Sequence, residues 1–413
     1  MGRLKSLGTK DISQFLFANA MYSLSTGLIS ILSPYLLRDS KTYEDFIYIF
    51  QNVMYLTSLF TAGLNVALLR FYKYNHAKYD FFFSLVVSVI ICGIFLLGFF
   101  ENNILTDWLN LKPSSFLEHL FIYISVCFSL MYIFNRAALT AKEKYKKIAF
   151  DISIIFVLRI IALYIVAIVG ISNLSLVLLI VCILPFFNEF LVFTKRLTTL
   201  KWGSLEGLRE FIFFSLKIAI IGILFLTSNR LLVIAVKSYD NSLAASLSFA
   251  NGLIGIISIL NTTLSSYFIG KLDYKNVASI TVYLKKVRRF TLPFFVLLAL
   301  VAAVGFAFVE VSYPDNATVT AWICAITICQ SGIIFFLGLV TLLAKTYNCL
   351  NVQLAVNVLV CIAVYLVVHT LTLHLDIIPK YLLVNLTIIL GEVCLMGYVL
   401  RRHSLQEKAA VAP

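Results

Sequence analysis

Stretches of about 20 apolar residues repeat along the whole chain, separated by short polar segments. A helix of about 20 apolar residues crosses the hydrocarbon core of a bilayer. The pattern therefore predicts an all-α polytopic membrane protein with twelve transmembrane helices. The predicted spans are 15–37, 46–69, 81–100, 116–139, 148–169, 174–193, 211–236, 243–268, 290–309, 319–343, 351–373 and 381–400.

The composition supports this class and limits the chemistry. Hydrophobic residues make up 61% of the chain and charged residues only 13%, against about 25% charged residues in a soluble domain. The longest predicted outer loop, 101–115, is too short for a catalytic domain, so we expect no enzyme. The eight cysteines lie in spans or beside the inner face, and no His/Cys cluster has metal-ligand spacing. We therefore expect neither a metal nor another cofactor.

Basic residues alternate between the two sides of the membrane. With the N-terminus inside, the inner segments hold 24 of the 33 Lys and Arg residues, the outer loops hold five, and four lie within spans. An excess of Lys and Arg in short loops marks the cytoplasmic side. We expect a multi-pass protein of the bacterial cytoplasmic (inner) membrane with both termini in the cytoplasm. The net charge of +13 reflects this topology and contact with membrane lipid, and it implies no nucleic-acid partner.

The segment 194–210 follows the sixth predicted span and divides the chain into two halves. Residues 34–65 and 230–261 align at one constant offset, with the same order of span and loop. Because each half has six spans, the two halves share one orientation, as in a parallel repeat. We predict two six-helix lobes around a central cavity, over residues 1–203 and 204–413.

A polar stripe runs along one face of the first predicted span, at helical spacing. It consists of Asn19, Ser23, Thr26, Ser30 and Ser33. A stripe of this kind either packs closely against another helix or lines the cavity. The sequence leaves both interpretations open.

Four basic residues lie within the predicted spans. Arg159 is at the middle of its span, where a charge costs about 2.5–3.5 kcal/mol on insertion scales, so we predict that it is functional or paired. Arg136, Lys217 and Arg230 lie nearer to span ends and can extend their charges towards the interface.

Three acidic residues in spans, Asp151, Glu189 and Glu392, are candidates for ion coupling. Glu392 lies at a depth similar to that of Arg159, which suggests a pair between the halves in one state. The alternative is two separately solvated charges. Gln330 is predicted to form a hydrogen bond between helices.

The chain resembles the O-antigen and polysaccharide flippases of the multidrug/oligosaccharidyl-lipid/polysaccharide exporter superfamily over essentially its whole length. The resemblance rests on the span pattern and on local motifs. These motifs are residues 15–19, 36–38 and 43–46, Gly63-Leu64-Asn65 followed by Arg70-Phe71, and Ser228-Asn229-Arg230 followed by Tyr239. Asn229 stands where the family often has an Asp.

This resemblance implies a function and a substrate. The implied activity is flipping of an oligosaccharide linked through pyrophosphate to undecaprenol, from the cytoplasmic to the periplasmic leaflet, during O-antigen, lipopolysaccharide or other polysaccharide synthesis. Other polysaccharide-assembly membrane proteins are then expected partners. Arg159 would be the central contact for phosphate or sugar, with Arg230, Lys217 and Arg136 as further cationic contacts. Asn19, Ser23, Thr26 and Ser30 would line the cavity.

Two other functions compete with flipping. A drug/cation antiporter of the same superfamily shares the fold, and Glu392 keeps this alternative open because such proteins favour acidic cavity residues. A polysaccharide polymerase or ligase acts on the same lipid, but it generally needs a large outer loop. The short outer loops of this chain argue against it.

Overall fold

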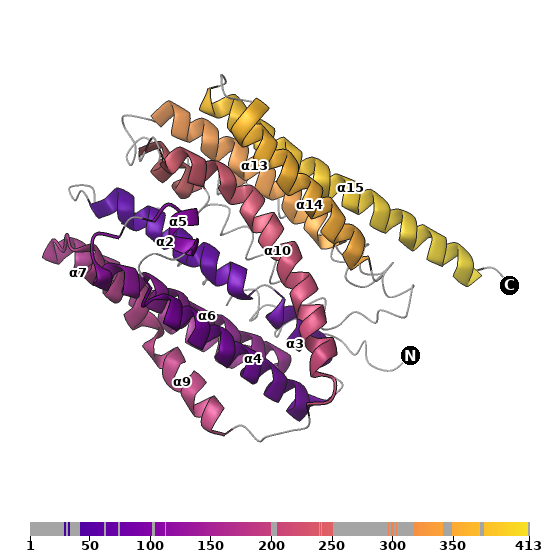
Figure 1. Cartoon of the computed structure of the whole chain (residues 1–413), viewed down its shortest axis with the longest axis horizontal. Helices are drawn as coiled ribbons and strands as arrows, with labels where there is room; N and C mark the ends of the chain where they lie inside the picture. Colours follow the sequence, from indigo (N-terminus) through magenta and orange to yellow (C-terminus); the bar gives the residue numbers. More distant parts are fainter. Residues whose placement is uncertain are drawn as a thin grey trace. The chain divides into compact units, whose positions relative to one another are not determined.

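The structure is a computed structural model. It describes residues 42–250, except 62, 73–74, 101–103, 112, 200–204, 239 and 241, and residues 317–341, 349–371 and 376–411. It also describes single residues between 29 and 33 and between 296 and 303. Every regular element in this part of the chain is a helix (Figure 1). The predicted all-α class is confirmed.

Nine helices of the described part are long and apolar enough to cross a membrane. They correspond to the second to seventh and the tenth to twelfth predicted spans. The first and ninth predicted spans lie almost wholly outside the described residues, and only residues 243–250 of the eighth are described. The observed helices are therefore consistent with the predicted twelve spans.

The chain divides into two compact units, residues 1–219 and 220–413. The division falls inside α10 (Leu208–Lys237), so the first part of this helix belongs with the N-terminal unit. Sequence spacing places the boundary at residue 203, in the connection before α10. The two six-helix lobes remain a prediction.

In the first unit, α6 is the central helix, because it packs against α2, α3, α4, α7 and α9 (Phe187–Thr198). Figure 1 shows α4 and α6 side by side. The helices of this unit before the sixth span are α2 (Thr42–Thr61), α3 (Leu64–Phe71), α4 (His76–Leu97), α5 (Ile104–Trp108), α6 (Phe116–Ala141) and α7 (Tyr145–Val169).

Polar residues fix where several of these helices begin. The Asn75 side chain accepts a hydrogen bond from the backbone N–H of Lys78 at the start of α4. At the start of α6, Ser115 accepts from the N–H of Glu118, whose carboxylate accepts from the backbone and hydroxyl of Ser114. Such caps satisfy N–H groups that have no partner within the helix.

Gly63 allows the second span to approach α10 at backbone distance. Its φ of +91° is a conformation that other residues rarely adopt. A Cβ atom here would lie 2.1 Å from the carbonyl oxygen of Ser215 and 2.9 Å from the amide nitrogen of Ala219. The Phe71 ring extends this contact towards Phe211, with ring centroids 6.0 Å apart. These contacts explain why the start of α10 belongs with the first unit.

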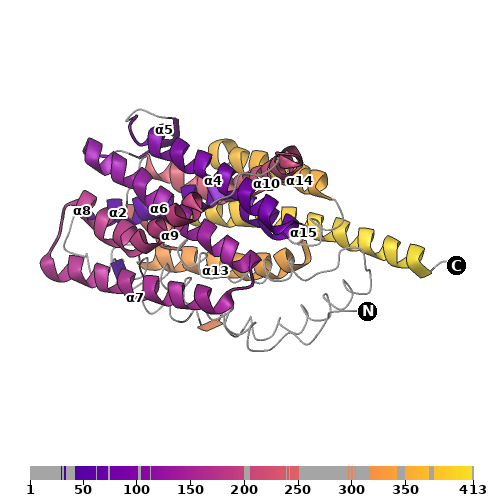
Figure 2. The same cartoon turned by 90° about the horizontal axis from the view of Figure 1, so that it is seen from below.

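In the second unit, α15 packs against α13 and α14, and Figure 2 shows α15 continuing past them towards the C-terminus. The side-chain amide of Gln330 donates to Asn229 at 3.2 Å, which confirms the predicted hydrogen bond between helices. The helices of this unit are α13 (Ala317–Thr341), α14 (Leu350–Leu366), the π-helical η5 (Val367–Leu371) and α15 (Ile377–Val411).

Replacement of Gly63 by alanine should destabilise the protein strongly. The left-handed conformation alone costs an alanine about 1–2 kcal/mol, and overlap with the backbone of α10 adds to this. Thermal unfolding in detergent measures the effect. Gly93→Ala is the matched control, because an added Cβ there meets nothing within 4 Å. Equal melting temperatures for the two variants would contradict this account of Gly63.

Candidate functional site

The sixth span is not a continuous α-helix. It begins as α8 (Leu174–Leu178), changes to the π-helical η1 (Leu179–Ile183), tightens to the 3-10 turn η2 (Leu184–Phe186), and continues as α9 (Phe187–Thr198). Pro185 lies within the 3-10 turn. Proline has no N–H for the helical ladder, and π-bulges occur frequently at functional sites. We call residues 179–186 the break of the sixth span.

Arg159 lies against this break. Its guanidinium carbon is 4.6 Å from the ring centroid of Phe186 and 5.7 Å from that of Phe50 on α2. The side chain is 1% exposed. The structure therefore places the predicted mid-span arginine inside the first unit, with its charge over aromatic rings. Its role as a substrate contact remains a prediction.

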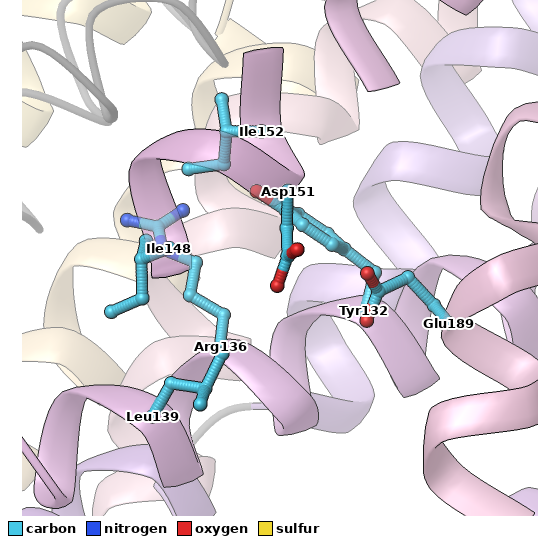
Figure 3. A pocket seen from close by; sticks show the side chains of 7 residues that line it. All are labelled: Tyr132, Arg136, Leu139, Ile148, Asp151, Ile152 and Glu189. Carbon is cyan, nitrogen blue, oxygen red and sulfur yellow. The ribbon is translucent and has the colours of Figure 1, made fainter. Parts of the chain in front are cut away.

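A small pocket lies beside α9. Figure 3 shows the Asp151 carboxylate between the side chains of Arg136 and Glu189. The structure thus brings together three residues that sequence analysis selected separately. The pocket is lined by Tyr132, Arg136, Leu139, Ile148, Asp151, Ile152 and Glu189.

Glu189 is the most buried carboxyl of this pocket, at 4% exposed. The side-chain amide of Asn135 on α6 donates to its carboxylate and to its backbone carbonyl, each at 2.9 Å. A neutral amide orients the carboxyl without neutralising it. Asn135 therefore fixes both the side chain and the first turn of α9.

Charges of both signs surround Glu189. Asp151 and Lys147 on α7 lie within electrostatic range of it, and Arg136 on α6 lines the same pocket. Two carboxyls with a guanidinium in a small pocket suit proton exchange or binding of a small polar group. No group of three His, Cys, Asp or Glu residues that could hold a metal ion is found among the described residues.

A second group of charges lies where α4, α6 and α9 meet the predicted cytoplasmic side. Asp80 pairs with Lys142 at 2.9 Å and also with Arg196. These side chains are partly exposed, so the pairs add little stability. They do fix the spacing of three helix ends next to the pocket.

The other charged residues predicted for the site lie on α10 and α15. Lys217 is exposed on α10, as expected for a side chain that reaches the interface. Arg230 is buried on the same helix, next to the Asn229–Gln330 hydrogen bond. Glu392 is half-buried on α15, and its pairing with Arg159 remains a prediction.

Most of the predicted polar stripe of the first span, namely Asn19, Ser23, Thr26 and Ser30, lies outside the described residues. Ser33 is described and buried, and its hydroxyl donates to the carbonyl of Ile29, four residues earlier.

Sequence analysis missed the neutral members of the site. Tyr132 lines the pocket and its ring also packs against Phe186, with centroids 5.4 Å apart. Asn135, next to Arg136, holds Glu189. A proline inside an apolar span was the available signal for the break, since Pro185 interrupts an otherwise regular pattern.

Comparison with known proteins identifies the fold. No family model and no curated protein sequence matches the chain. Among solved structures, it is similar to a multidrug resistance MATE family transporter of the MOP superfamily in an outward-facing conformation. The TM-score is 0.69, with 11% identity over 97% of this chain and 96% of the other.

Two further structures agree. The Vibrio cholerae MATE transporter VcmN, in its bent form, gives a TM-score of 0.64 with 13% identity over 96% of this chain and 98% of that one. A MOP superfamily transporter from Pyrococcus furiosus gives 0.62 with 11% identity over 96% of both chains. The chain has the fold of MATE transporters, and it is a multi-pass membrane protein.

Replacement of Asn135 by leucine should destabilise the protein by about 1–3 kcal/mol, the usual loss when a buried polar group loses its partner. Thermal unfolding in detergent tests this. Ser129→Ala on the same helix is the control, because the buried Ser129 hydroxyl has no hydrogen-bond partner among the described residues. We expect no loss for Ser129→Ala. An unchanged melting temperature for Asn135→Leu would show that the amide does not hold Glu189.

Proposed function

We propose that this protein is an ion-coupled exporter that moves its substrate across the bacterial cytoplasmic membrane by alternating access. The observation that carries the proposal is the full-length likeness to two MATE transporters and a further MOP superfamily transporter, which covers 96–97% of the chain in these three structures. Alternating access in folds built from two repeats follows from movement of one half against the other.

The pocket of the first unit supplies the coupling group in this proposal. Asp151 and Glu189 are two carboxyls in a small space, and Arg136 is a fixed positive charge beside them. When one carboxyl gains a proton, the net charge of the pocket changes by one, and the surrounding low dielectric makes that change costly unless the helices readjust. A protonation step of this kind can bias two conformations of the first unit.

An organic cation is the substrate class that we favour. The similar structures include a transporter described as conferring multidrug resistance. In the first unit, the carboxyls line the pocket, whereas Arg159 is buried against aromatic rings. The pocket of this unit therefore presents two carboxyls and one guanidinium, which favours a cation over an anion.

Flipping of a lipid-linked oligosaccharide is the second candidate. It is favoured by the motif resemblance and by the four Lys and Arg residues in the spans, Arg136, Arg159, Lys217 and Arg230. The guanidinium groups would bind pyrophosphate in bidentate geometry. The Pyrococcus furiosus transporter, described as having a binding pocket of reverse polarity, gives a precedent for different pocket charges on this fold.

Transport by purified protein in proteoliposomes separates the two candidates. We expect uptake of a fluorescent organic cation, such as ethidium, driven by an imposed pH or sodium gradient. Delivery of a lipid-linked oligosaccharide to the opposite leaflet, with no cation transport, would establish the second candidate. Activity in neither assay, with protein that is folded and correctly inserted, would overturn the proposal.

Neutralisation of the pocket carboxyls should abolish coupling. We expect Glu189→Gln and Asp151→Asn each to reduce gradient-driven uptake by about 100-fold or more, the loss typical for removal of a proton-transfer group. Exchange without a gradient should persist. The control is Glu210→Gln, because Glu210 is exposed at the start of α10. Normal gradient-driven uptake by a double variant that combines Glu189→Gln and Asp151→Asn would exclude the pocket as the coupling site.

A further inference from the structure

Side chains from neighbouring helices hold the start of α9 at two residues. Arg159 contacts Phe186 at the end of the 3-10 turn, and Asn135 bonds to Glu189 in the first turn of α9. Phe186, the last residue of the break, lies between the guanidinium of Arg159 and the ring of Tyr132. Glu189, three residues later, is held by Asn135. Arg159 and Phe186 are at most 1% exposed. The start of α9 is thus anchored at two points, one aromatic and one polar.

We propose that the break at residues 179–186 is a hinge in the sixth span, and that Arg159 is the positioning residue that holds it. In this role Arg159 contacts no substrate. It acts through Phe186 and thereby sets the position of Glu189. Arg159 therefore positions the break of the sixth span, whereas its depth in the membrane suggested contact with substrate.

The backbone of the break is suited to bending. Runs of π and 3-10 turns have weaker hydrogen-bond geometry than an α-helix, and they often mark hinges. Pro185 cannot donate a backbone hydrogen bond, and its ring disfavours the α-helical position of the carbonyl four residues earlier, that of Val181. Kinks in membrane helices arise at such features. The turns before and after the break, by contrast, are regular α-helix.

The packing around the break shows what opposes bending. Both α6 and α7 pack against η1 and η2. The buried thiol of Cys182, in the middle of the π-helical part, lies within electrostatic range of Arg159. The guanidinium of Arg159 itself contacts the 3-10 turn, over the ring of Phe186. A cation over an aromatic ring interacts with it more strongly at a desolvated site than at the protein surface.

Bending at the break would change the pocket. Glu189 follows Phe186 by less than one helical turn, whereas Asp151 and Arg136 belong to α7 and α6. A tilt or rotation of α9 about the break therefore moves one carboxyl relative to the other two charges. This consequence for transport rests on the proposed function. The hinge itself does not.

Hydrogen–deuterium exchange of the full chain in lipid nanodiscs tests the hinge. We expect Arg159→Met and Phe186→Leu to speed exchange of the amides of residues 179–189 on the order of tenfold, because both remove the desolvated cation–ring contact. Phe186→Trp, which keeps an aromatic face, should exchange like the natural protein. The amides of α4 serve as an internal control.

The double variant Arg159→Met/Phe186→Leu adds a second measure. If the two side chains act as a pair, its exchange should be no faster than that of either single variant. Additive acceleration, or unchanged exchange in both single variants, would overturn the hinge assignment. If Arg159→Met does not fold, the comparison of Phe186→Leu with Phe186→Trp still decides.

Transport kinetics separate the hinge from substrate contact. A positioning role predicts that Phe186→Leu and Arg159→Met lower the maximal rate and leave KM unchanged, with Phe186→Trp restoring the rate. A raised KM at an unchanged maximal rate in Arg159→Met would show substrate contact and overturn the proposal. Faster exchange in a protein that transports nothing would retain the hinge and refute the proposed function. Unchanged exchange in the variants of a protein that does transport would refute the hinge and retain the proposed function.

Discussion

The structure of this protein depends on the lack of water in the core of the bilayer. Every backbone group there must find a partner within the protein, which leaves helices as the practical solution for an apolar chain of this kind. Polar side chains follow the same constraint, and many of those described bond to a carbonyl one turn earlier in their own helix, as Thr57 and Ser125 do. The departures from this regularity are therefore informative. The sixth span departs from it, and a buried guanidinium, two carboxyls and an amide gather around the same segment.

The clustering of these groups has a common physical reason. A charge inside a membrane protein is costly unless other groups replace its hydration. Arg159 achieves this with two aromatic rings, and Glu189 with the Asn135 amide. The rings and the amide come from α2, α6 and the break itself, so each charged side chain ties neighbouring helices together. The same interactions that make the charges tolerable also make the first unit sensitive to their state.

Much of the fold could be predicted from the sequence. Long apolar stretches mark whole transmembrane helices, and the basic loops that alternate between the two sides mark their direction. The nine spans found in the described part of the chain all correspond to predicted ones. Span ends were less predictable, since α15 continues to Val411 as a regular helix after its apolar part ends. The site was predicted in pieces. Arg136, Asp151 and Glu189 stood out as charges, but their convergence depends on how α6, α7 and α9 pack, which no local pattern encodes. Asn135 and Phe186 carry no charge and so gave no signal.

The contact at Gly63 has a consequence for the membrane around the protein. The backbones of the second span and α10 meet there so closely that there is no space for even a methyl group. No acyl chain of a phospholipid can enter the seam at that level. A lipophilic molecule that enters the first unit laterally from the bilayer must therefore pass between other helices.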